Sequence, residues 1–302
     1  MHRAPLILSI ISLAISFDYC TLKCKIGGKY VNHTMCQYRE GGGENCASWK
    51  STMTFDMIRT LETRHNKMRE LTASSSETYK LGPVPNMLRL AWSDDLMATA
   101  QRWADQCEKN MSDVCRTSWK GVDTEQIMFK YYSSDKYFTP LTAIQSLLVS
   151  LEKQLEGEIT EILLGHNLRI LLNSKSDMFG CGFAWSVAKE QEHPWLYEYR
   201  LVCNYLMKTG KLSAYKVGEP CSKCPRNTKC DSSSQFPSLC AMKVLQNDPS
   251  PVTFCDPEED YAKKYFREHK SNGCACFPDV IRVVICLMSV FCHFMGFLTI
   301  NL

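Results

Sequence analysis

The sequence predicts an α+β fold in which amphipathic helices come first and strands come later. Three stretches, beginning near residues 55, 93 and 139, place apolar side chains at helical spacing. Two later stretches, "CGFAWSV" from Cys181 and "YEYRLVCNY" from Tyr197, have the composition of strands. Because helices and strands do not alternate strictly along the chain, the pattern favours α+β over a parallel α/β sheet.

The first expected helix covers residues 55–71. Its apolar face is formed by Ile58, Leu61, His65 and Met68, which recur at helical spacing. Since His65 lies within this face, we expect it to be a helix-packing residue and not a metal ligand.

The next two helices have recognisable start signals. Ser93 is the expected N-cap of the second helix, with Asp94 and Asp95 in the first turn, where the helix dipole favours negative charge. Its apolar stripe consists of Leu96, Ala100, Trp103, Ala104 and Cys107. The third helix is expected to begin at Thr139, a cap residue followed by proline at the first helical position. Its apolar face consists of Ile144, Leu148, Leu151 and Leu155.

Cysteine usage indicates an oxidising compartment. The chain has 302 residues and 17 cysteines, more than a reduced cytosolic protein carries unless it binds metal. Only one Cys-x-x-Cys pair occurs, from Cys221 to Cys224, and no second pair with histidines follows at zinc-finger spacing. Disulfides are therefore favoured. Residues 17–50 are expected to form a disulfide-stapled loop, and the polar, cysteine-rich stretch after Lys216 a stapled hinge.

The two ends of the chain are hydrophobic in different ways. Residues 1–16 combine a basic start, an apolar run and a small-x-small site, as in a secretory signal peptide. In a secreted chain the sequons at Asn32 and Asn110 become expected glycosylation sites. Residues 277–302 form a hydrophobic tail, interpreted as a glycolipid-anchor signal or a membrane span, with a buried helix as the third interpretation. The tail is thus a candidate membrane tether.

The charge balance argues against nucleic acid as the main partner. The net charge of +3 is the difference between 35 basic and 32 acidic residues. No block of Lys and Arg builds a phosphate-binding surface.

Several motifs, in one order, resemble the CAP superfamily of cysteine-rich secretory, antigen 5 and pathogenesis-related group 1 proteins. They are "RHNKMRE", "GPVPNMLRLAWSDDLMATAQRWADQC", "GHNLRILLNSKSDMFGCG", "LVCNYLMKTG" and "GEPCSKCP". The opening "DYCTLKCKIGGKYVNHTMCQY" is most similar to the arthropod antigen 5, or venom allergen, branch. The resemblance covers about residues 20–240. It implies a three-layer α-β-α sandwich over 17–215, followed by a cysteine-rich hinge and extension over 216–276.

The resemblance also implies a disulfide pattern that spacing alone cannot select. The implied pairs are Cys20–Cys36, Cys24–Cys115, Cys46–Cys107, Cys181–Cys203, Cys221–Cys230 and Cys224–Cys240. The apolar run that follows His166 and precedes Cys181 is expected to build the sheet.

Many members of that family carry a cleft in which two histidines and two glutamates can hold a divalent metal. The resemblance assigns one histidine position to His166 and one glutamate position to Glu125. It places Met111 and Ser150 at the other two positions, and a thioether is a poor zinc ligand. Glu152 lies on another side of its helix and would reach the cleft only with a shifted alignment. We therefore expect no cofactor and at most weak divalent metal (Zn) binding. The alternative for His166 is a hydrogen bond to Glu125 or to backbone.

The sequence does not favour an enzyme. Ser174 and Ser176 follow His166 closely, but a nearby serine and histidine do not make a catalytic triad. No G-x-S-x-G or H-E-x-x-H motif occurs. We expect a secreted or surface-tethered binding protein.

Two classes of ligand remain open. The segment 128–138 is expected to be a loop and carries aromatics that the resemblance links to sterol or lipid binding: Phe129, Tyr131, Tyr132, Tyr137 and Phe138. The alternative is that these rings pack on the third helix. The second class is an extracellular protein, because a disulfide-rigid scaffold suits a receptor- or channel-binding effector of the venom or saliva type.

Overall fold

The computed structural model describes residues 18–51, 53–74, 81–108, 112–135, 138–156, 165–187, 196–207, 215–230 and 232–242. The predicted signal peptide, the hydrophobic tail, and Asn110, Met111 and Tyr137 lie outside these residues. In the parts of the chain described, no helix has both the length and the apolar character needed to cross a membrane.

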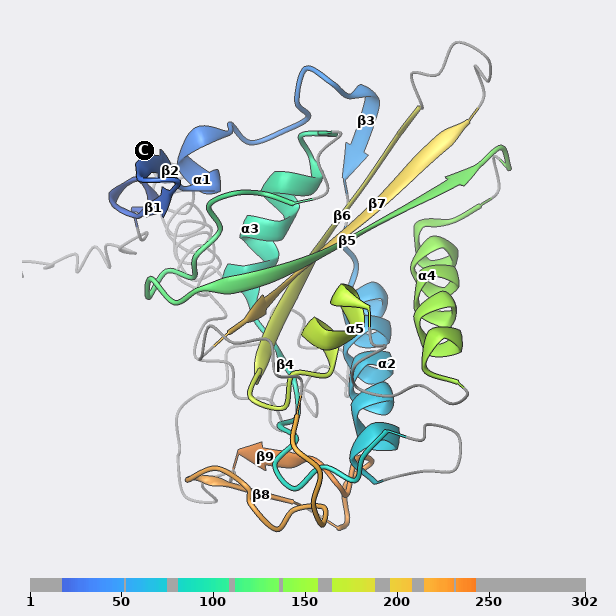
Figure 1. Ribbon diagram of the computed structural model, residues 1–302. Helices are drawn as coiled ribbons and strands as arrows, with labels where there is room; N and C mark the ends of the chain where they lie inside the picture. Colours follow the sequence, from blue (N-terminus) through green and yellow to red (C-terminus); the bar gives the residue numbers. More distant parts are fainter. Residues whose placement is uncertain are drawn as a thin grey trace, which may run out of the picture.

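A five-stranded sheet forms the centre of the molecule (Figure 1). Its order is β3 (Ala47–Ser51), β6 (Met178–Val187), β7 (Tyr197–Leu206) and β5 (Thr124–Ser133), all antiparallel to their neighbours. Strand β4 (Ala91–Trp92) pairs with β6 in parallel. The strands expected near residues 181 and 197 are confirmed as β6 and β7.

Helices cover both faces of this sheet, which confirms the α+β, three-layer α-β-α architecture (Figure 1). On one face α2 (Phe55–Ala73), α4 (Pro140–Leu155) and the short α5 (His166–Leu171) share a core with alternate strand residues such as Phe183 and Leu201. On the other face α3 (Asp94–Ala104) packs on their neighbours Ala184 and Val202. Successive strand residues point to opposite faces, so each strand serves both layers.

Two expectations from the sequence are wrong. The apolar run after His166 does not build the sheet: it is helix α5, whose Leu168 and Ile170 are buried against the α2 side of the core. The segment beginning at 128 is not a loop over its first half, because β5 runs to Ser133 and pairs with β7 through ten residues. The two errors have different causes. A short apolar run such as the one after His166 can form either helix or strand, and periodicity alone does not decide between them. The strand from Thr124 to Ser133 depends on its pairing with β7, which lies far along the chain.

The Gly-Cys-Gly of β6 explains how closely α3 approaches the sheet. A Cβ added at Gly180 or Gly182 would lie 2.3 or 2.2 Å from backbone atoms of α3. Only glycine leaves room there. Cys181, between them, points to the opposite face and is bonded to its cross-strand neighbour Cys203.

The N-terminal segment is more ordered than a stapled loop. It contains η1 (Tyr19–Thr21), the hairpin β1–β2 (Lys23–Ile26 and Lys29–Asn32) and the short helix α1 (Thr34–Gln37). In the hinge, β8 (Thr228–Cys230) pairs with β9 (Cys240–Met242).

The cysteines form the six pairs that the resemblance implies. They are Cys20–Cys36, Cys24–Cys115, Cys46–Cys107, Cys181–Cys203, Cys221–Cys230 and Cys224–Cys240. Two of them attach the N-terminal segment to the sandwich, and two close the hinge on itself.

Candidate functional site

The implied cleft residues come from β5, α4 and α5, and both helices contact β5. Glu125 lies at the start of β5, where its side chain is about one-third exposed. Its carboxylate lies 3.6 Å from the guanidinium of Arg116. His166 is the exposed first residue of α5. Among the described residues no hydrogen bond joins His166 to Glu125; the other form of that alternative, a hydrogen bond to backbone, stays a prediction.

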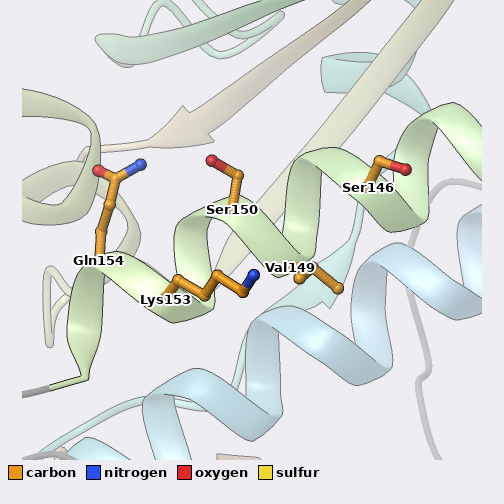
Figure 2. A pocket seen from close by; sticks show the side chains of 5 residues that line it. All are labelled: Ser146, Val149, Ser150, Lys153 and Gln154. Atoms are coloured by element: carbon orange, nitrogen blue, oxygen red, sulfur yellow. The ribbon is translucent and has the colours of Figure 1, made fainter.

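Ser150 lies on the solvent side of α4. It lines a shallow depression of about 410 Å³ together with Ser146, Val149, Lys153 and Gln154, all from the same helix (Figure 2). Ser150 and Gln154 point to one side of the helix axis, whereas Lys153 and Val149 point toward the neighbouring helix (Figure 2). Glu152 does not face the cleft, because its carboxylate bonds Arg64 of α2 at 2.6 Å.

These residues do not fit a tight zinc site. The described donors are one exposed imidazole, one carboxylate engaged by a guanidinium, and one hydroxyl. Zinc sites in proteins use three or four nitrogen, sulfur or carboxylate ligands that converge. The hinge sulfurs of Cys221, Cys224 and Cys230 do lie within 4.8 Å of one another. All three are in disulfides, however, and zinc needs free thiolates.

A buried polar cluster lies behind the cleft, and it accounts for the motif "RHNKMRE". His65 is 1% exposed. Its Nδ1 is 2.7 Å from the carbonyl oxygen of Leu61 and its Nε2 is 2.7 Å from the hydroxyl of Tyr205. A carbonyl only accepts, so the Nδ1 atom of His65 donates. Because burial lowers the pKa of His65, the ring is neutral at pH 7, and its Nε2 atom accepts from the hydroxyl of Tyr205. Burial lowers the pKa of His65 to about 4 and raises the pKa of Tyr205. His65 is thus a packing residue, as expected.

Arg69, one turn further along α2, is fully buried. Its guanidinium donates five hydrogen bonds to four backbone carbonyls, those of Leu88, Leu171, Asn173 and Ser176. Burial lowers its pKa to about 9, which still leaves it charged at neutral pH. This one side chain joins the segment before β4 to the turn between α5 and β6, and so positions His166 relative to the sheet.

The serines near His166 are not placed for catalysis. Ser174 and Ser176 are 3% and 0% exposed, whereas His166 faces solvent. A substrate cannot reach a hydroxyl that the protein covers completely. No nucleophile–base pair of the triad kind is formed by these residues.

A row of aromatic rings crosses the sheet next to the start of α4. Tyr131, Tyr199 and Trp185 are cross-strand neighbours on β5, β7 and β6. Phe138 stacks on Tyr131 with ring centroids 4.9 Å apart. At the other end Tyr197 meets Trp185 edge-on at 5.6 Å. All of these except the buried Tyr199 are partly exposed at the edge of the core.

The aromatics expected to bind lipid separate into groups. Phe129, Tyr131 and Phe138 are partly buried against the core, so they follow the packing alternative in part. Tyr132 points to the other side of the strand and is 44% exposed. Trp185, Tyr197 and Tyr199 were not among the site residues expected from the sequence. The signal in the sequence was the placement of these aromatic residues at alternate positions of "AWSV" and "YEY", because side chains two positions apart in a strand share one face of the sheet.

Comparisons with known proteins agree with the motifs. The family model for the CAP, or cysteine-rich secretory protein, family matches residues 63–205. Venom allergen 5 of Polistes dominula is 31% identical over 215 residues, covering 66% of this chain and 89% of the relative. Venom allergen 5.01 of Dolichovespula maculata is also 31% identical, with the same coverage.

Solved structures similar to this chain include two with low sequence identity. One is the hookworm platelet inhibitor, with 20% identity and a TM-score of 0.40 over 66% of this chain and 97% of that one. The other is NaASP2 with Zn²⁺, with 18% identity and a TM-score of 0.46 over 66% of this chain and all of that one.

Proposed function

Because the chain belongs to the CAP family of cysteine-rich secretory proteins, we propose that it is a secreted, non-enzymatic binding protein. Its ligand is a flat apolar molecule of the sterol or fatty-acyl class. The binding surface is the aromatic row, defined as Tyr131, Phe138, Tyr197, Tyr199 and Trp185.

The observation that carries this proposal is the continuity of the row. Along the row, from Phe138 at one end to Tyr197 at the other, the centroids of neighbouring rings are separated by 4.9 to 6.1 Å. The rings therefore form one strip and are not isolated side chains. Aromatic faces present large apolar area at little cost in conformational entropy. The hydroxyl of Tyr199 donates to the carbonyl oxygen of Phe138 at 3.1 Å, which fixes the far end of the strip.

The surroundings of the implied cleft residues support a binding role without catalysis. Glu125 is engaged by Arg116, and the serines after His166 are covered. The proposal therefore assigns no reaction and no metal-dependent step to this chain.

The test uses the full chain and a fluorescent sterol, dehydroergosterol, whose absorption overlaps tryptophan emission. We expect saturable binding with energy transfer from Trp185. Trp185→Leu should reduce the transfer, to which the other five tryptophans of the chain also contribute, and Tyr197→Ala should weaken binding about tenfold, since an aromatic contact contributes roughly 1.5 kcal/mol.

Tyr132→Ala is the matched control, because Tyr132 follows Tyr131 of the row on β5 but points to the other side of the sheet. It should leave the affinity unchanged. Equal loss in Tyr132→Ala and Tyr197→Ala would show that the row is not the site. Failure of the folded wild-type chain to bind either a sterol or a fatty acid would refute the proposal and leave the protein-ligand class.

A further inference from the structure

Two turns that are far apart in the sequence are joined into one surface. They are the hairpin β1–β2, with its Gly27-Gly28 turn, and the segment 114–121. The disulfide Cys24–Cys115 links them directly. The Nε2 atom of His33 is also within 2.8 Å of the carbonyl oxygen of Thr117.

The carboxylate of Asp95 joins the segment 114–121 to η1, which directly precedes the hairpin. It accepts a hydrogen bond from the hydroxyl of Tyr19 and another from the backbone N–H of Trp119. The hairpin and the segment 114–121 therefore move as one body. We call this surface the two-turn patch.

Both turns protrude into solvent. A Cβ added at Gly27, Gly28 or Gly121 would meet no atom within 4 Å. The patch nevertheless carries four of the eight large hydrophobic residues that are exposed in the described chain: Ile26, Tyr30, Val114 and Trp119, which are 43%, 71%, 55% and 45% exposed. Single exposed hydrophobics are ordinary, but a concentration of them on projecting turns indicates an interaction surface.

The charge of the patch is positive. Four exposed lysines lie among the hydrophobic residues: Lys23, Lys25, Lys29 and Lys120. Residues 19–32 and 114–122 contain no Asp or Glu. Of the neighbouring carboxylates, Asp113 is buried and bonded to Thr34, Asp18 caps η1, Asp95 accepts from Tyr19 and Trp119, and Asp123 is exposed beside the second turn. The exposed side chains of the two turns themselves are therefore cationic and not acidic.

The hairpin presents this combination on both of its faces. Ile26 is opposite Lys29 on one face, and Tyr30 is opposite Lys25 on the other. A protein partner would dock on one face. A hairpin with an apolar and a cationic side chain on each face is instead suited to enter an interface tip-first, with its lysines at headgroup level.

We propose that the two-turn patch docks the protein on membranes that expose anionic phospholipid headgroups. The lysines meet the phosphate and carboxylate groups. Tyr30 and Trp119 lie at the headgroup boundary, where amphipathic rings are favoured, and Ile26 enters the acyl region. This surface is separate from the aromatic row, and the inference holds whether or not the row binds a ligand.

The experiment measures partitioning of the full chain onto vesicles of phosphatidylcholine alone and with 30% phosphatidylserine added. The apolar stretch 283–300 has no Asp, Glu, Lys or Arg, and its one histidine, His293, is neutral at pH 8. At that pH any binding through this stretch is equal on both vesicles, and the difference reports the patch. We expect binding that is stronger on anionic vesicles and weakens from 50 to 300 mM salt. The triple variant Lys23/Lys25/Lys29→Ser should lose about one hundredfold in partitioning, since each lysine near such a surface contributes about 1 kcal/mol.

The matched control removes three exposed lysines from the hinge, Lys216/Lys223/Lys229→Ser, with the same change in net charge. It should keep the preference for anionic vesicles. Ile26→Ser should weaken binding while leaving the salt dependence intact.

Equal losses in the two triple variants would overturn the proposal, because only net charge would then matter. So would the absence of any anionic preference in a wild-type chain whose circular dichroism shows it folded. Lysine-dependent binding to polyglutamate beads without binding to vesicles would also overturn it, in favour of an acidic protein partner.

Discussion

Replacing Arg69 by methionine tests whether the buried guanidinium holds the cleft side of the fold together. Methionine keeps the length of the side chain and removes the charge and all five hydrogen bonds. Four backbone carbonyls then lose a charged donor in a region where water cannot replace it. Removing one partner from a buried charged network typically costs about 3–5 kcal/mol. We expect Arg69→Met to lower the free energy of unfolding by this amount.

Arg69→Lys refines the estimate. Lysine keeps the charge but has a single ammonium group in place of the planar fork, so it cannot reach all four carbonyls. We expect a loss of about 2 kcal/mol.

The assay is guanidinium chloride unfolding at pH 7 with the disulfides intact, followed by tryptophan fluorescence. Arg64→Met is the control, because Arg64 is on the same helix but forms a single ion pair with Glu152 that is partly open to solvent, the side chains being 32% and 18% exposed. Such pairs contribute less than about 1 kcal/mol. If Arg69→Met and Arg64→Met shift the midpoint equally, the assignment of Arg69 as the link between these segments is wrong.

Three further predictions concern the same core. The folded-state pKa of His65 is lowered to about 4, below its ordinary value of 6.5. Between these two pH values the unfolded chain therefore binds more protons than the folded chain. The contribution of His65 to the free energy of unfolding is complete above pH 6.5 and falls by up to about 3 kcal/mol as the pH drops toward 4. His65→Gln should remove that slope in denaturant midpoints measured from pH 4 to 7. Gly182→Ala should destabilise by more than about 3 kcal/mol, since its Cβ meets helix backbone, whereas Gly165→Ala, which meets nothing within 4 Å, should change the thermal midpoint little. Replacing Cys181 and Cys203 together by alanine opens a bridge with a separation of 22 residues and should cost about 3 kcal/mol in calorimetry; no loss would mean that the strand pairing alone holds β6 to β7.

The helix starts were predictable because their signals are local. The side chains of Ser93 and Thr139 accept hydrogen bonds from backbone N–H groups three residues on, and both helices begin where these caps predict. Burial of Leu61, His65 and Met68 also follows from spacing within one helix. By contrast, α3 ends at Ala104, before Cys107, whose φ of 52° is incompatible with a continuing helix.

The candidate site was predictable only in part. Glu125, Ser150 and His166 could be located from motif order, but their surroundings could not. The engagement of Glu125 by Arg116 and the position of Glu152 against Arg64 depend on which helix faces which strand. The aromatic row needed the cross-strand register of β5, β7 and β6, and Tyr131 of β5 lies about 55 to 70 residues before its partners Trp185 and Tyr199.

The sequence by itself determined the α+β class, the helix starts set by caps, and the use of cysteines in disulfides, because each depends on composition or on residues within one turn. Only the tertiary structure decided that the run after His166 is a helix, that residues 124–133 pair with β7, and that Arg69 serves four distant carbonyls. These features follow from contacts between segments far apart in the chain, where the free energy of burying a partner outweighs the local preference of either segment.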